Sequence, residues 1–288
     1  MKIHSCPSLT CLSSRGQLPV TLINLEIRDC PKLESIAERF HNNNSLASIS
    51  IWDCGNLKFI PEGLQNLNQL QGIHIFDCFS LVSMGKEGLP NTNFGIQVRR
   101  CPKLEALPNH LDSLNSLHHF EVWYCPSITS FPEKGFPTSL KSLSIVDLKL
   151  WKPLIEWGLY RLTSLKSLRI GGSPDIDAES FTEEEMGIVL PSSLTHLNIT
   201  DFKKLKYLSS EGFQNLTSLT SLFIMHCPNL ISFPVVGLPS SLLHLLIVDS
   251  PLLKKQCKRN EGREWSKIAH IPYIEIDRKN IYDEDYEE

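Results

Sequence analysis

The chain has 288 residues, of which 41% are hydrophobic and 21% are charged, and its formal net charge is −4 at pH 7. These proportions are typical of a folded, soluble protein. No run of about eighteen uncharged apolar residues is present to span a bilayer, and the scattered lysines and arginines form no basic field for nucleic acid. The segment Met1–Cys6 lacks the features of a secretory signal. We therefore expect a cytoplasmic protein, with a nuclear or peripheral plasma-membrane location as alternatives.

One apolar frame runs through the chain. It reads L-x-x-L-x-I-x-x-C-x-x-L and recurs every 23 to 29 residues, which is the pattern of a leucine-rich repeat. The middle apolar pair of each copy marks an expected strand. In chain order these pairs are Leu25 and Ile27, Ile49 and Ile51, Ile73 and Ile75, Ile96 and Val98, Phe120 and Val122, Leu143 and Ile145, Leu168 and Ile170, Leu197 and Ile199, Leu222 and Ile224, Leu245 and Ile247, and, in a degenerate last copy, Ile274 and Ile276.

The spacing of the apolar pair predicts how the repeats pack. Two residues separated by one lie on the same face of a strand, because strand side chains alternate with period 2. A single repeat cannot bury this face alone, but stacked repeats join their strands at roughly 4.8 Å into a parallel sheet with a continuous core. The predicted fold class is α/β, a leucine-rich-repeat solenoid with a curved parallel β-sheet on the concave face and short turns with little helix on the convex face.

We expect three segments along the chain. Residues 1–253 hold about eleven repeats, the first of them incomplete; residues 254–279 form a C-terminal capping segment with the degenerate last repeat; and residues 280–288 form an acidic tail. The chain opens in the middle of a repeat, without a capping unit to cover the sheet edge. This opening favours a fragment of a longer protein or a truncated gene product.

The cysteines and the missing motifs argue against catalysis. Seven of the nine cysteines share the turn position after the strand: Cys6, Cys30, Cys54, Cys78, Cys101, Cys125 and Cys227. Asn or Cys commonly satisfies backbone groups there, and neither this spacing nor a C-x-x-C pair indicates a metal site. No phosphate-binding or hydrolase motif occurs. We expect reduced structural thiols, no cofactor, no metal and no catalytic residue.

Aspartates recur at the end of the predicted strands, at Asp29, Asp53, Asp77, Asp147, Asp201 and Asp249. An aspartate at a strand end most often accepts a hydrogen bond from a nearby backbone N–H in an Asx turn. We favour this interpretation over an acidic docking stripe.

The residues just before these strand ends are the candidate binding site. Arg28, Trp52, Phe76, Arg99 and Trp123 occupy this position in five consecutive repeats, and strand alternation directs them to the concave face. Trp and Arg are enriched in binding hot spots, and an exposed aromatic row is unfavourable unless something covers it. We predict a protein-binding surface here. The alternative is that the rings simply pack on one another along the sheet.

Four further residues flank this row, either in the strands or at the start of the following turn. They are Glu26, His74, Glu121 and Tyr124, and we include them in the predicted protein-binding surface. Five neighbouring strands would make a stripe about 20 Å long, which suits a protein partner better than a small molecule.

Several phrases resemble the C-terminal leucine-rich-repeat region of plant intracellular nucleotide-binding disease-resistance receptors of the coiled-coil class. They are IRDCPKL at 27–33, IMHCPNL at 224–230, GLPSSL at 237–242 and the closing phrase GREWSKIAHIP at 262–272. The resemblance covers essentially the whole chain. It implies a protein-recognition module that senses pathogen effectors or guarded host proteins and restrains the receptor's own nucleotide-binding domain.

The same resemblance implies that ADP and ATP bind that upstream domain, which this chain does not contain. Two other functions remain open from the sequence. One is the substrate-binding arm of a ubiquitin-ligase adaptor, which normally has a clear convex helix in each repeat. The other is the ectodomain of a surface receptor, which requires a signal peptide and a membrane segment.

Overall fold

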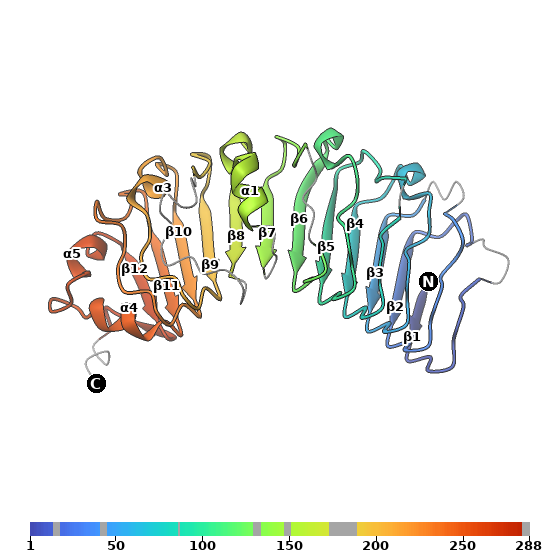
Figure 1. Ribbon diagram of the computed structural model, residues 1–288, viewed down its shortest axis with the longest axis horizontal. Helices are drawn as coiled ribbons and strands as arrows, with labels where there is room; N and C mark the ends of the chain where they lie inside the picture. The colour runs from blue at the N-terminus through green and yellow to red at the C-terminus, as the bar shows by residue number, and fades with distance from the viewer. Residues whose placement is uncertain are drawn as a thin grey trace. The chain divides into compact units, whose positions relative to one another are not determined.

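A computed structural model describes residues 1–13, 18–40, 45–85, 87–128, 134–146, 151–172 and 189–283, except for the side chains of Trp151, Lys152 and Glu211. The chain divides into two compact units, residues 1–150 (unit 1) and residues 151–288 (unit 2). In each unit the strands stand side by side, and loops and short helices connect their ends (Figure 1).

The strands of unit 1 follow one another in chain order. They are β1 (Lys2–His4), β2 (Asn24–Arg28), β3 (Ser48–Trp52), β4 (Gly72–Phe76), β5 (Phe94–Arg99), β6 (Leu117–Trp123) and β7 (Ser142–Val146). Each strand pairs in parallel with the next. The register brings equivalent repeat positions together, so that Ile27 lies opposite Ile51 and Ile51 lies opposite Ile75.

The inward side chains of these strands form the core of unit 1. Ile27, Ile51 and Ile75 are completely buried, as are Leu33 and Leu57 in the turns that follow. Burial of one such side chain contributes roughly 1.5–3 kcal/mol to the free energy of folding. Because each repeat adds an equivalent layer, the core continues from strand to strand.

A left-handed backbone residue ends most strands. Asp29, Asp53 and Asp77 have φ angles of 51°, 52° and 58°, a conformation that Asp tolerates better than most residues do. The backbone N–H of Asp29 donates to Trp52 O, and that of Asp53 donates to Phe76 O. In the described part of unit 1, the carboxylates of Asp29 and Asp53 form no hydrogen bond with nearby backbone. There the aspartates fit the backbone angle, and the expected Asx turn is not formed.

The other predicted aspartates follow the same rule where the structure describes them. Asp201 and Asp249 of unit 2 have φ angles of 59° and 46°, whereas Asp147 lies outside the described residues. Arg100 and Tyr124 take the same conformation in their repeats, with φ angles of 51° and 53°. The position therefore selects a backbone conformation and does not require a carboxylate.

The repeated cysteines lie just beyond this turn residue. Cys30, Cys54, Cys125 and Cys227 are buried, and each thiol donates to the carbonyl oxygen two residues earlier, with a sulfur–oxygen distance of 3.4 Å. A buried carbonyl group thus gains a partner in each repeat, which is the structural role expected from the sequence.

The segments that return the chain between strands of unit 1 contain little helix. They include the 3₁₀ turns Leu64–Asn66 and Leu111–Ser113. Gly63 precedes the first turn with a φ of 89°, and a Cβ at this residue would lie 2.6 Å from the carbonyl oxygen of Phe40. This close approach allows only glycine, because the neighbouring repeat's backbone fills the space.

Unit 2 repeats the same plan. Its strands are β8 (Ser167–Gly171), β9 (His196–Thr200), β10 (Ser221–Met225), β11 (His244–Val248), β12 (Tyr273–Ile276) and β13 (Lys279–Asn280). Strands β8 to β12 pair in parallel in chain order, whereas β13 turns back and pairs antiparallel with β12. Ile274 and Ile276, the pair of the degenerate repeat, are buried in β12.

The helices in the described part of unit 2 are short. They are α1 (Trp151–Trp157), α3 (Ser210–Gln214), α4 (Pro251–Gln256) and α5 (Trp265–Ile268), together with the 3₁₀ turn Leu159–Arg161. No helix in the described part of the chain is long and apolar enough to cross a bilayer. The parallel strands, the buried repeat positions and the small amount of helix confirm the predicted α/β leucine-rich-repeat solenoid. The proposed segment boundaries at 253 and 279 stay a prediction, and residues 284–288 of the acidic tail lie outside the described residues.

Candidate protein-binding surface

Two rows of side chains cross the open face of unit 1, which is the face of the sheet that points away from the core. The end row consists of the last residues of β2 to β6, which are Arg28, Trp52, Phe76, Arg99 and Trp123. The middle row lies two residues earlier and consists of Glu26, Ser50, His74, Gln97 and Glu121. Within each row, neighbouring residues are direct partners in the sheet register, so the repeat spacing gathers residues far apart in sequence into two continuous lines.

The end row is a continuous stack of rings and guanidinium groups. The Arg28 guanidinium carbon lies 4.6 Å from the centroid of the Trp52 ring, and the Trp52 and Phe76 rings meet edge to face with centroids 4.5 Å apart. Arg99 lies between two rings, 5.2 Å from the Phe76 centroid and 3.9 Å from the Trp123 centroid. Distances below about 6 Å give attractive cation–π contacts, so each member of the row holds its neighbour.

Carboxylates of the middle row fix the two arginines. Arg28 Nε donates to Glu26 Oε1 over 2.7 Å, and Arg99 Nε donates to Glu121 Oε1. Lys2 and His4 of β1 also contact Glu26, at 3.1 and 3.4 Å. The ammonium group of Lys2 is the main reason that the pKa of the Glu26 carboxyl lies below its usual range.

Glu121 is the most enclosed charge on this face, with only 5% of its surface exposed. Burial by itself raises the pKa of this carboxyl, but hydrogen bonding with His119 and Arg99 outweighs burial and lowers the pKa overall. Glu121 Oε2 lies 3.7 Å from His119 Nε2. A buried carboxylate that is satisfied from two sides holds its partners in one geometry.

His74 connects the two rows. Its Nδ1 lies 3.4 Å from Ser50 Oγ, and its ring stacks parallel to that of Phe76 at a centroid distance of 6.5 Å. Burial is the largest cause of its lowered pKa, and the charge of His119 adds to the effect. His74 is therefore neutral near pH 7 and belongs to the packed part of the surface.

The nine predicted site residues differ in how much a partner could touch them. Arg28 is exposed, and Trp52, Arg99 and Trp123 are half-buried. Phe76 is only 7% exposed, because its neighbours on both sides cover it. Eight of the nine lie in the two rows. The ninth, Tyr124, lies in the left-handed turn after β6 and is 39% exposed.

Sequence reasoning missed one partner of the end row. Ser144 of β7 accepts a hydrogen bond from Trp123 Nε1 over 2.6 Å, and it continues the middle row, because it lies opposite Glu121. Strand alternation alone could have placed Ser144 on the open face, since it lies between the inward residues Leu143 and Ile145. Serine is too common at strand surfaces to stand out without the register.

The pockets found among the described residues are lined by residues outside the two rows. Among the described residues, no group of three or more His, Cys, Asp or Glu side chains could hold a metal ion. The two rows form a continuous surface in which each charge already has a partner. Such a surface is suited to contact with another macromolecule, as polar and aromatic side chains held in fixed positions favour recognition.

Comparisons with known proteins show a resemblance over about half of the chain. No family model matches the chain. Over 140 residues, or 49% of its length, the chain is 34% identical to an Arabidopsis thaliana protein named "Putative disease resistance protein At3g14460", and this match covers 9% of that protein. The circular leucine-rich-repeat structure CroV588 aligns with 90% of this chain and 50% of its own length, at 18% identity and a TM-score of 0.28. The Arabidopsis match confirms the resemblance to the leucine-rich-repeat region of plant disease-resistance proteins.

Proposed function

We propose that this chain is the protein-recognition module of an intracellular plant immune receptor and that its partner contacts the open face of unit 1. The partner is a pathogen effector, a guarded host protein or the receptor's own nucleotide-binding domain. ADP and ATP belong to that separate domain. The chain itself acts in the cytoplasm by binding and carries out no reaction.

The end row is the observation that supports this proposal. It exposes tryptophan and arginine, the residue types that most often dominate binding energy at protein interfaces. The cation–π stack and the carboxylates of Glu26 and Glu121 hold these side chains before a partner arrives. A prearranged surface loses less conformational entropy on binding, so more of the contact energy appears as affinity.

Trp52 offers an additional contact. Its Nε1 is buried and has no hydrogen-bond partner among the described residues, whereas Trp123 Nε1 donates to Ser144. An unpaired buried donor is unfavourable by about 1–3 kcal/mol. A partner that rotates the Trp52 ring outward and accepts this hydrogen bond recovers that free energy, which makes Trp52 the expected centre of the interface.

The test compares tryptophan variants with a matched aromatic control. Trp52→Ala and Trp123→Ala remove rings from the end row, and Tyr160→Ala removes an exposed ring from unit 2 that also contacts an arginine, Arg161. Proteins retained from plant leaf extract by the immobilised chain are quantified by mass spectrometry, and the affinity of each retained protein is then measured directly. We expect a specific partner to bind each tryptophan variant about thirtyfold more weakly, corresponding to about 2 kcal/mol.

The control and the melting temperature make the result interpretable. Tyr160→Ala should bind the partner as the unaltered chain does, and all three variants should melt within a few degrees of it. If no retained protein distinguishes the tryptophan variants from Tyr160→Ala, the open face of unit 1 is not the recognition surface. If both tryptophan variants unfold, the rings serve packing, as in the alternative interpretation of the sequence.

A further inference from the structure

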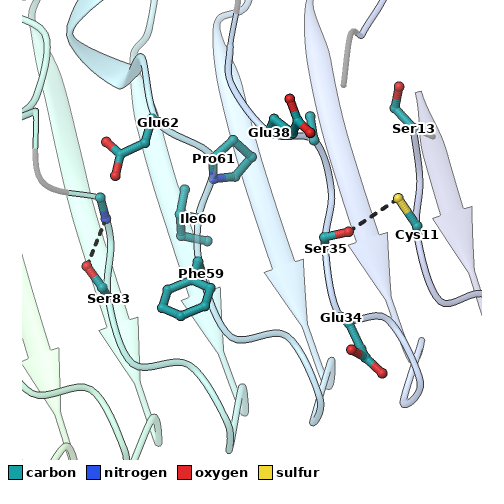
Figure 2. A pocket seen from close by; sticks show the side chains of 12 residues that line it. Cys11, Ser13, Glu34, Ser35, Glu38, Phe59, Ile60, Pro61, Glu62 and Ser83 are labelled. Atoms are coloured by element: carbon teal, nitrogen blue, oxygen red, sulfur yellow. Dashed lines mark hydrogen bonds between the residues drawn. The ribbon is translucent and has the colours of Figure 1, made fainter. Parts of the chain in front are cut away.

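Two grooves of similar volume, one in each unit, differ in the charge of the residues that line them. The groove of unit 1 has a volume of about 440 Å³, and its Glu34 carboxylate is already paired with Lys58, 3.7 Å away. Figure 2 shows this groove, in which Ser35 donates a hydrogen bond to Cys11. The groove of unit 2, which we name the basic groove, has a volume of about 420 Å³. Its charged lining residues are Lys254, Lys255, Lys258, Asp277 and Lys279.

Asp277 is the one carboxylate among the described residues that line the basic groove, and both of its oxygens are engaged. Oδ2 accepts a hydrogen bond from Lys254 Nζ over 2.7 Å, and Oδ1 accepts one from the backbone N–H of Asp249 over 3.0 Å. Asp277 therefore neutralises Lys254 and leaves the charges of the other three lysines.

These three lysines give the basic groove a surplus of positive charge. Lys258 Nζ lies 3.5 Å from Glu261, but both side chains are more than two thirds exposed, so this ion pair is weak. No acidic side chain in the described part of unit 2 pairs with Lys255 or Lys279. Like charges gathered in one groove repel each other, and an anion placed among them removes that repulsion.

The lysines belong to two elements that the core holds in place. Lys255 lies on α4, which the completely buried side chain of Leu253 anchors. Lys279 lies on β13, opposite Ile276 of β12 in the sheet register. Because the backbones of both elements are fixed, the lysines cannot relieve their repulsion by moving apart as whole residues.

The residues that follow β13 carry the opposite charge and begin beside the groove. The hydroxyl of Tyr282 donates to Ile271 O over 2.7 Å, and the guanidinium carbon of Arg259 lies 5.7 Å from the centroid of the Tyr282 ring. Arg259 directly follows Lys258, so these contacts fix Tyr282 near the groove. The sequence then reads DEDYEE at 283–288, of which residues 284–288 lie outside the described residues. Six extended residues span about 20 Å, which is long enough to reach the lysines.

We propose that residues 283–288, which we name the acidic segment, bind in the basic groove and pair with Lys255 and Lys279. A segment tethered beside its site has an effective concentration of about a millimolar, so ion pairs that are individually weak are sufficient to hold it. The bound segment shields the lysines from other anions. This contact lies within unit 2 and is independent of the recognition surface proposed for unit 1.

Carbodiimide cross-linking of the full chain tests the contact directly, because this reagent joins only a carboxylate and an amine that touch. Lys255 is the diagnostic residue, since it lies far from the acidic segment in sequence. We expect mass spectrometry to find Lys255 linked to the acidic segment at low salt and much less so at about 1 M salt, where charges are screened beyond about 3 Å. Lys166, an exposed lysine of unit 2 outside the groove, is the control. Equal linkage of Lys166, or none of Lys255, would contradict the proposal.

A variant with a neutral segment tests whether the carboxylates hold it. The variant keeps the length of the chain and changes each acidic residue to its amide: Asp283→Asn, Glu284→Gln, Asp285→Asn, Glu287→Gln and Glu288→Gln. Acetylation of Lys255 by an amine-reactive ester should become several-fold faster in this variant, whereas that of Lys166 should not change. An unchanged rate at Lys255 would overturn the proposal.

The same variant leaves the groove open to a labelled peptide of sequence DEDYEE. Because tethering supplies only about a millimolar, a segment that is mostly bound requires a dissociation constant below about 1 mM for the free peptide. Fluorescence anisotropy should show such binding to the neutral-segment variant and much weaker binding to the unaltered chain, whose own segment competes. Equal binding to both proteins would contradict occupation of the groove by the segment.

Lysine replacements in the neutral-segment variant locate the peptide. Lys255→Gln and Lys279→Gln should each weaken peptide binding about two- to fivefold, the range of an exposed ion pair, and Lys166→Gln should leave it unchanged. All three side chains are exposed, so the melting temperatures should stay the same. An equal loss in Lys166→Gln would show general attraction between the peptide and positive charge, and the basic groove would not be the site.

Discussion

The open faces of the two units have the same backbone plan and different side chains. In unit 1 the end row alternates guanidinium groups and aromatic rings, and the middle row holds carboxylates that bind those guanidinium groups. In unit 2 the corresponding positions on β10 and β11 are aliphatic or aromatic without charge. Phe223 lies opposite Leu246, and Met225 lies opposite Val248.

The repeat frame therefore determines where outward side chains stand, and the residues at those positions determine what the surface can recognise. Both units keep parallel strands, the left-handed residue and the buried turn position. None of these shared features distinguishes the charged rows of unit 1 from the uncharged stretch on β10 and β11 of unit 2, beyond which Arg169 of β8 and Glu275 of β12 occupy the same outward position. The difference between the units arises wholly from residues that the core does not constrain.

The largest expected effect is the slow alkylation of the buried cysteines, and it should be the same in both units. Burial raises the pKa of Cys54 in unit 1 to about 11 and that of Cys227 in unit 2 to about 12. At pH 8 the thiolate fraction of Cys54 is then only about 10⁻³, and the reagent must wait for local opening. We expect Cys54 and Cys227 of the folded chain to react more than about a thousandfold more slowly than the exposed Cys11, as measured by alkylation and mass spectrometry.

After unfolding, nearly all nine cysteines should alkylate without prior reduction. A majority found in disulfides would contradict the reduced, cytoplasmic state that the sequence predicts. Fast labelling of Cys227 but slow labelling of Cys54 would show that the two units do not share one backbone plan.

Replacement of Phe76 tests how much the packing of the end row contributes to the free energy of unfolding. Because its ring is 7% exposed and packed between Trp52 and Arg99, Phe76→Ala should lower the free energy of unfolding by about 3 kcal/mol. Met225→Ala, in the corresponding row of unit 2, removes a half-exposed side chain and should lower it by about 1 kcal/mol or less. Urea denaturation measures both values. Equal losses would mean that the end row of unit 1 is no better packed than the face of unit 2.

Glu121 tests whether the middle row holds the arginines. Glu121→Gln leaves Arg99 without its carboxylate, so it should lower the free energy of unfolding by about 1–3 kcal/mol. In unit 2 the middle-row residue Asn198 has a buried carbonyl oxygen with no partner among the described residues. Asn198→Ala should therefore change stability by less than about 0.5 kcal/mol. If Asn198→Ala lowers the free energy of unfolding more than Glu121→Gln does, the claim that the Glu121 carboxylate stabilises the surface by holding Arg99 is wrong.

The lowered pKa of Glu121 predicts that its contribution to the free energy of unfolding depends on pH. Its folded-state pKa is lowered overall, although burial opposes the shift, so the folded chain binds this proton less readily than the unfolded chain. The resulting stabilisation is complete above the unfolded pKa of about 4.3 and is lost as pH falls through the lower folded value. The stability difference between the unaltered chain and Glu121→Gln should therefore shrink below about pH 4.

His74 is expected to have the smallest effect. Burial lowers its pKa, so below about pH 6.5 the unfolded chain takes up a proton before the folded chain does. Stability that depends on neutral His74 is thus present above about pH 6.5 and declines as the pH falls towards the lower folded value. The His74→Gln variant should lose this dependence, which we expect to be below about 1 kcal/mol, when denaturation midpoints are compared between pH 5 and 7.

The sequence predicted the fold because its apolar frame is regular. The pair Leu25 and Ile27 and its counterparts marked the strands, and equal spacing implied that equivalent positions would align. The end row could be predicted for the same reason, since alternation alone places Trp52 and Trp123 outward. Alternation could not show that Phe76 is covered, because its burial depends on the sizes of the side chains in the neighbouring strands.

The contacts between rows also escaped prediction. Arg99 and Glu121 lie diagonally across β5 and β6 and are 22 residues apart in the chain. Their pairing depends on side-chain rotamers as well as on register. The Asx turns were expected from residue preference, whereas the backbone angle is what selects aspartate at Asp29 and Asp53.

The most direct test of the central claim compares two double variants. Trp52→Ala with Trp123→Ala removes the half-exposed rings of unit 1, and Phe223→Ala with Leu246→Ala removes two outward side chains of unit 2. The dissociation constant of a partner retained by the unaltered chain is measured for both, at temperatures where both remain folded. Recognition by the open face of unit 1 predicts at least about thirtyfold weaker binding for the tryptophan double variant and less than about threefold for the other. Loss of binding by the unit 2 double variant, with the tryptophan double variant unaffected, would contradict it.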